Sequence, residues 1–146
     1  MSFLNSIDVS ASGLTAQRLR LDVISQNIAN VSTTRTEDGG PYRRKTVLFE
    51  ERQGGQLFSQ ILSEKTDGKT GGGVRVSRIA EDDNPFELAY DPGHPDANEE
   101  GYVAMPNVNI VTEMVNMISA SRSYEANVTA MNAMKSMAAK ALEIGR

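Results

Sequence analysis

Cysteine and tryptophan are both absent from this 146-residue chain, and aromatic residues make up only 5% of it. Without cysteine there is no disulfide, no thiolate nucleophile and no cysteine-ligated metal. Because aromatic side chains contribute the largest buried areas to a core, their scarcity indicates a small compact core. The length suits one ordinary domain.

Two kinds of hydrophobic segment are also missing. Residues 1–6 carry no basic charge and no continuous apolar stretch of the kind found in signal peptides. No run approaches the roughly 18 apolar residues that cross a bilayer. The sequence therefore predicts neither a cleaved signal peptide nor insertion into a membrane.

A basic surface is missing too. The formal net charge is −4, and the segment over residues 35–108 alone carries a net −5. Residues 1–34 are neutral and residues 109–146 carry a net +1. Binding to nucleic acid depends on a basic patch that neutralises phosphates, so this class of partner is excluded.

Glycine and proline concentrate in the middle of the chain. Residues 35–108 hold ten of the 12 glycines and all five prolines. This distribution predicts three segments: an N-terminal assembly helix over 1–34, a β-rich acidic insert over 35–108 and a C-terminal assembly helix over 109–146. The predicted fold class is mainly α, with the two long terminal helices pairing as a coiled coil and the small β-rich insert between them.

The N-terminal segment repeats apolar residues with helical spacing. Ser2 suits the N-cap, and Asn30 suits a left-handed cap that ends the helix at about residue 30 or 31. Gly13 would let another helix approach closely. The predicted interface face of this helix comprises Leu4, Ile7, Ala11, Leu14, Leu21, Ile24 and Ile28.

The C-terminal segment repeats the pattern after Pro106, which blocks a helix upstream. Asn109 can cap the first turn, and Glu113 lies where a carboxylate favours the helix dipole. The first half of this helix is apolar over a wide arc, which indicates several neighbours. Its predicted interface residues are Ile110, Met114, Met117, Ile118, Tyr124, Val128, Met131 and Leu142.

The middle segment alternates apolar and polar residues in short stretches. Strands are predicted at residues 45–49, 74–79, 86–90 and 102–105, with flexible loops at 53–55 and 66–73. Such a small sheet is weakly stable by itself.

No set of residues offers catalytic chemistry. The single histidine, His94, lies in a turn built by proline and glycine, and no second histidine could share a metal. The triple glycine at 71–73 lacks the lysine and the helix of a phosphate loop. The acidic stretch at 81–84 lacks calcium-loop spacing, so a solvated turn is expected. We therefore expect no enzyme, no metal site and no cofactor.

Three consecutive cations, at residues 43–45, allow two interpretations. They form a solvated strand face, or they contact the acidic insert of another subunit. Arg18 and Arg122 interrupt the helical stripes, and they are candidates for polar pairs that fix the register of neighbouring helices.

The two helical arms also allow more than one interpretation. They could pair with each other as an antiparallel hairpin within one monomer. They could instead order only in an assembly, because isolated helices are marginal in water and two helices cannot cover faces this wide. A soluble coiled-coil adaptor or secretion chaperone that binds a client helix is the alternative function.

Two long motifs resemble the bacterial flagellar rod and hook proteins. The N-terminal motif comprises residues 10–16, SASGLTA, and residues 21–31, LDVISQNIANV. The C-terminal motif comprises residues 108–118, VNIVTEMVNMI, and residues 119–127, SASRSYEAN. The middle stretches PYRRK (41–45) and DPGHPDANEEGYV (91–103) resemble the proximal-rod members of that family.

The resemblance implies a structural subunit of the flagellar basal body, in a tubular helical assembly in the periplasm. The terminal helices would form the inner coiled-coil layer, and the insert would face outward. Export would use the flagellar type III apparatus without signal cleavage. Partners would be proximal and distal rod subunits, the rod–hub adaptor and membrane-ring components, besides self-association. The rod would transmit torque and line the export channel.

Overall fold

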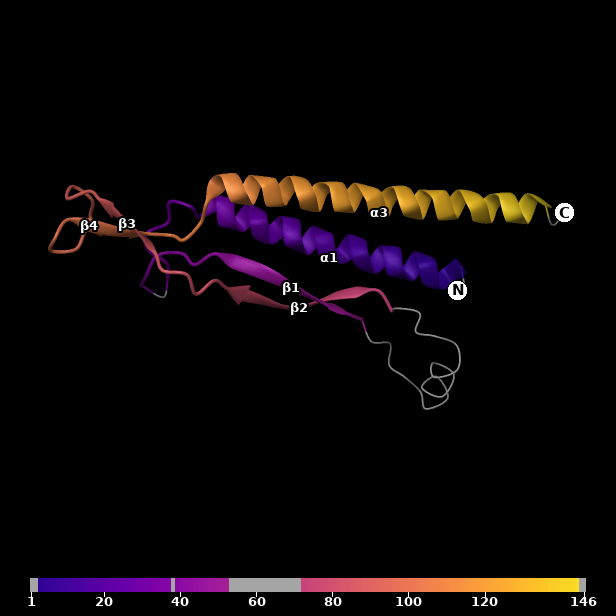
Figure 1. The fold of residues 1–146 in the computed structure, drawn as a ribbon, viewed down its shortest axis with the longest axis horizontal. Helices are drawn as coiled ribbons and strands as arrows, with labels where there is room; N and C mark the ends of the chain where they lie inside the picture. The colour runs from indigo at the N-terminus through magenta and orange to yellow at the C-terminus, as the bar shows by residue number, and fades with distance from the viewer. Residues whose placement is uncertain (1–2, 38, 53–71, 145–146) are drawn as a thin grey trace, which may run out of the picture. The chain divides into compact units, whose positions relative to one another are not determined.

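A computed structural model describes residues 3–37, 39–52 and 72–144 of the chain. Its elements, in chain order, are α1 (Phe3–Ala29), β1 (Lys45–Glu51), β2 (Val74–Glu81), β3 (Glu87–Tyr90), β4 (Tyr102–Met105) and α3 (Ile110–Ile144) (Figure 1). The expected fold class, two long terminal helices with a small β-rich insert between them, is confirmed. The strands predicted in all four places are present.

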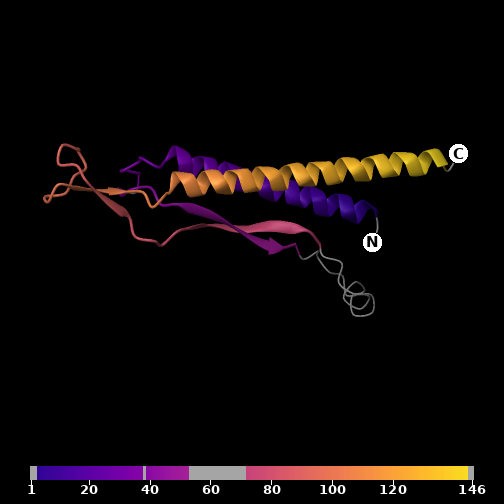
Figure 2. The same cartoon turned by 45° about the horizontal axis from the view of Figure 1, so that its top comes forward.

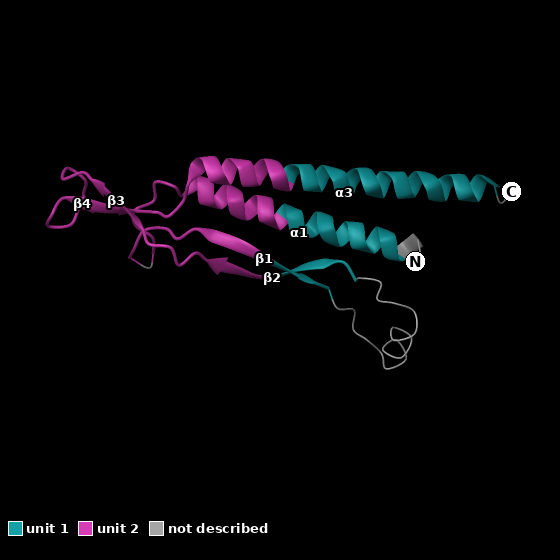
Figure 3. Cartoon of the chain, viewed as in Figure 1, with its two compact units in different colours: residues 1–18, 49–77, 121–146 teal, residues 19–48, 78–120 magenta. Residues whose placement is uncertain are grey.

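The chain divides into two compact units, coloured separately in Figure 3. Unit 1 consists of Met1–Arg18, Phe49–Ser77 and Ser121–Arg146, and unit 2 consists of Leu19–Leu48 and Arg78–Ala120. Each unit combines a stretch of α1, a stretch of α3 and residues of β1 and β2. Within each unit the two helical stretches lie side by side, as the two views in Figures 1 and 2 agree.

The helix ends show how local polar groups set the boundaries. At the start of α3, Oδ1 of Asn109 accepts the Thr112 amide at 3.0 Å, so the predicted cap is confirmed. The left-handed cap predicted at Asn30 is wrong, because only glycines among the described residues have positive φ. Asn30 instead donates its Nδ2 to the Gln26 carbonyl oxygen at 2.9 Å and the chain leaves through turns. The N-cap predicted at Ser2 lies outside the described residues.

The strands form two two-stranded sheets, β1–β2 and β3–β4. β3 and β4 are antiparallel, with Leu88 opposite Ala104 and Tyr90 opposite Tyr102. The loops predicted at 53–55 and over 66–71 lie outside the described residues.

Unit 1 is held by close contacts of two kinds. One joins its stretches of α1 and α3, and the other joins α1 to the start of β2. A Cβ added to Gly13 would lie 3.1 Å from Nδ2 of Asn127, so the close helix approach expected at Gly13 is confirmed. The hydroxyl of Ser12 accepts the Val74 amide at 3.0 Å. Gly73, with φ of +94°, lies against Ser12 where a side chain would collide.

Unit 2 contains most of the buried residues of the described chain. Its buried apolar side chains come from both helices, from β4 and from the segments beside them. Two polar side chains are buried with them, Asn27 and Glu113, and both have no exposed surface. The apolar members are Val23, Ile24, Tyr42, Val103, Val108 and Ala120.

The Gly13–Asn127 contact yields a double-mutant prediction. Gly13→Ala alone should gain little, because the new methyl group must displace the Asn127 amide, which also donates to the Ser123 carbonyl oxygen at 3.0 Å. In an Asn127→Ala background the same change should stabilise by about 1 kcal/mol, the helix propensity gain of alanine over glycine.

The measurement is urea unfolding of the four proteins. Equal effects of Gly13→Ala in both backgrounds would contradict the contact, since touching residues show non-additive energies.

Candidate functional site

The side chain of Asn27 is a polar group buried on a helix face that is otherwise apolar. Its Nδ2 donates to the Lys45 carbonyl oxygen at 2.8 Å and to Oε2 of Glu113 at 2.9 Å. Its Oδ1 accepts the Lys45 amide at 2.9 Å and the Tyr42 hydroxyl at 3.0 Å. All the hydrogen-bonding capacity of the amide is therefore used. By bonding both backbone groups of Lys45, Asn27 fixes where β1 begins.

Glu113 lies in the first turn of α3, as expected, but its carboxylate is buried rather than solvated. Nε and Nη2 of Arg44 donate to its Oε1 at 3.0 and 2.8 Å. Burial disfavours a charged carboxylate and by itself would raise the pKa of Glu113. The hydrogen bonds from Asn27 and Arg44, together with the charge of Arg44, outweigh burial, so this pKa is lowered. Glu113 is thus held as a carboxylate.

Arg44 also binds a second acid and an amide. Its Nη1 lies 3.3 Å from Oδ2 of Asp82. Asn107 accepts the Arg44 backbone amide at 2.9 Å and donates to the carbonyl oxygens of Asp82 and Asn84, both at 3.1 Å. Burial would lower the pKa of Arg44, but its bonds to the two carboxylates raise it. We name this cluster the polar node: Asn27, Tyr42, Arg44, Asp82, Asn107 and Glu113.

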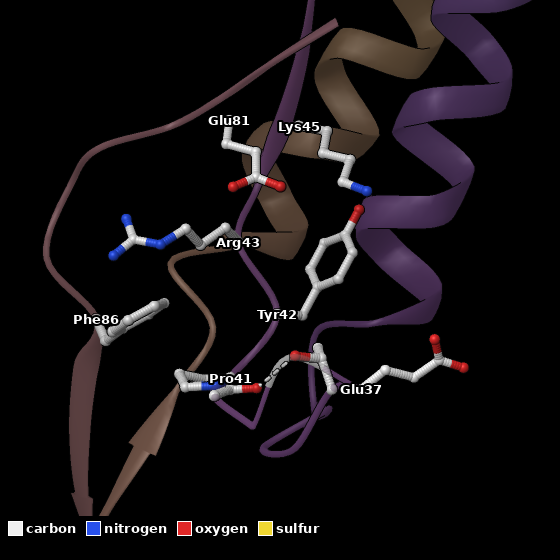
Figure 4. A pocket seen from close by; sticks show the side chains of 9 residues that line it. Glu37, Pro41, Tyr42, Arg43, Lys45, Glu81 and Phe86 are labelled. Carbon is white, nitrogen blue, oxygen red and sulfur yellow. Dashed lines mark hydrogen bonds between the residues drawn. The ribbon is translucent and has the colours of Figure 1, made fainter.

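A hollow of about 500 Å³ lies beside the polar node within unit 2 (Figure 4). The Arg43 guanidinium carbon lies 4.6 Å from the Phe86 ring centroid. Burial, together with the charges of Glu81 and Glu113, raises the pKa of Tyr42. These contacts are cation–π and hydrogen-bonding ones, and they offer no nucleophile with a base.

The structure changes the interpretation of the three cations at 43–45. Arg44 is only partly exposed, and its acidic partners, Asp82 and Glu113, belong to its own chain. A solvated strand face is therefore wrong for this residue, and a contact with the acidic insert of another subunit stays a prediction. The sequence hid the pairing because 69 residues separate Arg44 from Glu113.

The structure brings parts of the two flagellar motifs and of the PYRRK stretch to this node. Asn27 comes from the N-terminal motif, Tyr42 and Arg44 from PYRRK, and Glu113 from the C-terminal motif. Sequence reasoning missed Asn27 and Tyr42 as site residues. The signal that could have revealed Asn27 is its position one helical turn after Val23, which places a polar amide on the buried face of α1.

The predicted interface residues differ in exposure in the isolated chain. Ile24 is buried, and the side chain of Leu4 lies outside the described residues. The half-buried members are Ile7, Ala11, Leu14, Leu21, Ile28, Met117, Val128 and Met131. The exposed members are Ile110, Met114, Ile118, Tyr124 and Leu142.

One part of α3 in unit 2 displays a continuous apolar surface. We name it the α3 stripe: Ile110, Val111, Met114, Val115 and Ile118, whose side chains are 45–70% exposed. At 100° per residue they occupy an arc of about 140°. This arc lies beside the buried side that carries Glu113 and Ala120, so one helix presents both a buried seam and an uncovered apolar face.

The remaining candidates form local structure. His94 accepts the Asp96 amide through Nδ1 at 3.1 Å, and Asp82 accepts the Asn84 amide at 3.1 Å, as turns do. Within the described ranges, no group of three or more potential ligands could hold a metal ion. Arg18 and Arg122 are exposed and pair with no described residue, so their role in register stays a prediction. No described helix is long and apolar enough to cross a membrane.

The polar node makes stability depend on Glu113. Glu113→Ala removes the acceptor of two Arg44 nitrogens and of one Asn27 N–H, leaves Arg44 with Asp82 as its acidic partner, and should cost about 3 kcal/mol at neutral pH. Glu113→Gln should cost less, because the amide oxygen still accepts. Because the pKa of Glu113 is lowered in the folded protein, its contribution is present at neutral pH and fades as pH falls below the ordinary value of 4.5.

Urea unfolding at pH 7 and at pH 3.5 measures both effects. Glu125→Gln, which changes an exposed glutamate on the same helix, is the control. A Glu113→Ala cost no larger than that of this control would refute the node.

Asn27→Asp should reverse the pH dependence. The introduced carboxylate would face the Glu113 carboxylate, where Asn27 donates at 2.9 Å, so the variant should lose about 3–5 kcal/mol at pH 7. Protonation of the pair restores a donor, so stability should rise as pH is lowered toward about 5. Thermal unfolding across this range tests it, with the exposed Asn132→Asp as control. A stability that does not rise over this range would contradict the geometry.

Comparison with known proteins agrees with these motifs. Residues 7–35 match the family model described as "Flagella basal body rod protein", and residues 99–144 match "Flagellar basal body rod FlgEFG protein C-terminal". The flagellar basal-body rod protein FlgC of Bacillus subtilis is 54% identical over 152 residues, covering 100% of both chains. That of Borreliella burgdorferi is 53% identical, covering 99% of this chain and 98% of its own, and that of Escherichia coli O157:H7 is 44% identical, covering 100% of both. The chain belongs to the FlgC family of flagellar basal-body rod proteins.

Proposed function

We propose that this chain, a structural subunit of the flagellar basal-body rod, polymerises through its terminal helices into the tubular drive shaft of the proximal rod. It is not an enzyme, because its relatives are named as structural rod proteins. The shaft would transmit torque and surround an export channel. The terminal helices would pair as a coiled coil in the inner layer, and the insert would face outward.

The observation that carries the assembly proposal is the α3 stripe. Five large apolar side chains are about half exposed or more on one arc of a single helix. Scattered exposed apolar residues are ordinary, but a contiguous apolar surface marks an interaction site. Its position beside the buried seam favours neighbours that pack on the same helix from another side.

The size of the stripe bears on the kind of assembly. Covering five half-exposed side chains would contribute on the order of 4–8 kcal/mol, at roughly 1.5–3 kcal/mol for each fully buried one. Association costs at least about 4 kcal/mol before any net affinity appears. One stripe therefore supports only weak pairing, and an ordered structure needs several contacts per subunit. Repeated head-to-tail contacts that do not close provide these in a helical filament.

The polar node gives the subunit a mechanical role. It joins the last turn of α1, the start of β1 and the first turn of α3 through hydrogen bonds of 2.8–3.0 Å. A force on the helical stretches of unit 2 would reach β1 through these bonds. The node thus makes this unit stiff where a shaft must carry load.

The predicted partners follow from this proposal. Neighbours would be other proximal-rod subunits, the distal rod, the rod–hub adaptor and membrane-ring components. The subunit would lie in the periplasm after export without a cleaved signal peptide. A coiled-coil adaptor or chaperone, which would form a closed dimer of fixed mass, is favoured by no specific observation.

Polar substitutions in the α3 stripe should block assembly and leave the fold intact. Val111→Gln with Val115→Gln removes two side chains that are 70% and 61% exposed. The purified variant should keep its unfolding free energy within about 0.5 kcal/mol, because surface changes of this kind are nearly neutral. Introduced in place of the parent gene in the source bacterium, it should give few complete basal bodies and small swimming halos.

Thr112→Gln is the matched control, since Thr112 is exposed on the same turn but lies outside the stripe. Electron micrographs of purified basal bodies and soft-agar halos supply the two readouts. Normal basal bodies in the double variant would show that the stripe is not an assembly surface.

A further inference from the structure

The β3–β4 hairpin of unit 2 carries a second exposed surface, made by strands instead of a helix. Leu88 and Tyr90 are 68% and 67% exposed, and Tyr102 is 39% exposed. Because Tyr90 pairs with Tyr102, and side chains two residues apart share a face, these three lie on one side of the hairpin. The two tyrosine rings meet edge to face with centroids 5.3 Å apart. We name this surface the hairpin face.

On the opposite side of the hairpin, β4 packs through one residue, whereas β3 is exposed over its whole length. Val103, which alternates with Tyr102 along β4, is only 2% exposed. The hairpin therefore uses one face for its own core and leaves the face with the larger aromatic area uncovered. A two-stranded hairpin gains little from exposing Leu88 and Tyr90 to water, so their placement needs a partner.

The loop that closes the hairpin is ordered by its own hydrogen bonds. Oδ1 of Asn98 accepts the amides of Glu100 and Tyr102 at 3.1 and 2.8 Å. Gly101 has φ of +82°, and a Cβ there would lie 3.0 Å from a ring carbon of Tyr90. The loop thus holds the ring of Tyr90 in place. A surface that is rigid before binding loses less entropy when a partner arrives.

The chain segment that carries the hairpin face has charged residues of one sign, although Arg43 from another segment lies over Phe86 beside β3. Residues 79–121 contain nine aspartate and glutamate residues and no lysine or arginine. Glu99 and Glu100, in the loop that closes the hairpin, are exposed, and they form no ion pair with any residue that the structure describes. An anionic lipid surface or a nucleic acid would be repelled by this rim.

We propose that the hairpin face docks a cationic protein surface on another component of the basal body, one whose arginine or lysine side chains surround an apolar patch. The rings of Tyr90 and Tyr102 would receive the guanidinium or ammonium groups, and Leu88 would contact the apolar centre. Glu99 and Glu100 would pair with the remaining cations. The chain already uses this chemistry internally, where Arg43 stacks on Phe86 at 4.6 Å.

This surface goes beyond the helix-driven assembly. It lies on strands, it is polar at its rim and aromatic at its centre, and it would need a partner of opposite charge. The α3 stripe is apolar and has no such rim over its five residues. A variant that loses the contact of the hairpin face can therefore keep the contact of the α3 stripe, and an experiment can separate the two.

The test is photo-crosslinking in the motile source bacterium. A benzophenone amino acid replaces Leu88 in the full chain, and another strain carries it at Val111 to report helix-driven assembly. Basal bodies are purified after irradiation, and crosslinked peptides are sequenced. At Leu88 we expect a peptide from a different protein that carries arginine or lysine beside apolar residues.

The charge dependence decides the outcome. Glu99→Gln and Glu100→Gln together should lower the Leu88 adduct about tenfold and leave the Val111 adduct unchanged. The matched double change to aspartate should keep the adduct. Glu100→Arg, combined with Arg→Glu or Lys→Glu at the crosslinked site of the partner, should restore an adduct that Glu100→Arg alone removes.

Several results would overturn the proposal. They are an adduct unaffected by the double Gln change, a crosslinked peptide without basic residues, an adduct only to a second copy of this chain, and no Leu88 adduct in basal bodies. A missing Val111 adduct would count against the helix-driven assembly and not against the hairpin face.

Discussion

The carboxylate of Glu113 is the group on which the arrangement of unit 2 depends. One oxygen accepts from Asn27 of α1, and the other accepts from two nitrogens of Arg44 beside β1. Since α3 begins at Ile110, this single side chain holds its first turn against the end of α1 and the start of the insert. A buried charge without partners would cost several kcal/mol, so each element is held in the one position that supplies them. The stability gained from such a pair over an apolar one is small, and its main effect is specificity of position.

The polar node also explains why neighbouring side chains of α3 face different surroundings. Once Glu113 points inward, Ala120, two turns further along, is buried with it, and the α3 stripe faces outward. The inner seam combines a small residue with a polar one, whereas the outer arc is large and apolar. That is the reverse of an ordinary surface helix, whose apolar side faces its own core. The chain thus has a large apolar helical surface that the residues described by the structure leave uncovered.

Much of the fold could be predicted from the sequence, because it depends on local signals. The helical spacing of apolar residues predicted the two helices, Pro106 and Asn109 predicted the start of α3, and the alternation of apolar and polar residues predicted the four strands. The cap at Asn30 was wrong, because its side chain bonds back to Gln26 and no left-handed residue is needed. The site was not predictable in the same way. Asn27, Tyr42 and Glu113 are separated in the chain, and each alone has an ordinary local role as a surface amide, a loop residue or a helix-dipole partner. These side chains become buried only when the fold brings them into contact.

The two uncovered surfaces of unit 2 impose different demands on what covers them. The α3 stripe has no charge to select a partner, so it can pack on any helix of suitable shape, including one from another copy of this chain. The hairpin face carries aromatic rings within an acidic rim, and charge of one sign repels a second copy of the same face. Symmetric pairing of two hairpin faces is therefore disfavoured, whereas a cationic partner is favoured. A subunit built this way separates the two tasks of a rod component: the stripe favours continued growth with similar subunits, and the hairpin face selects one different neighbour.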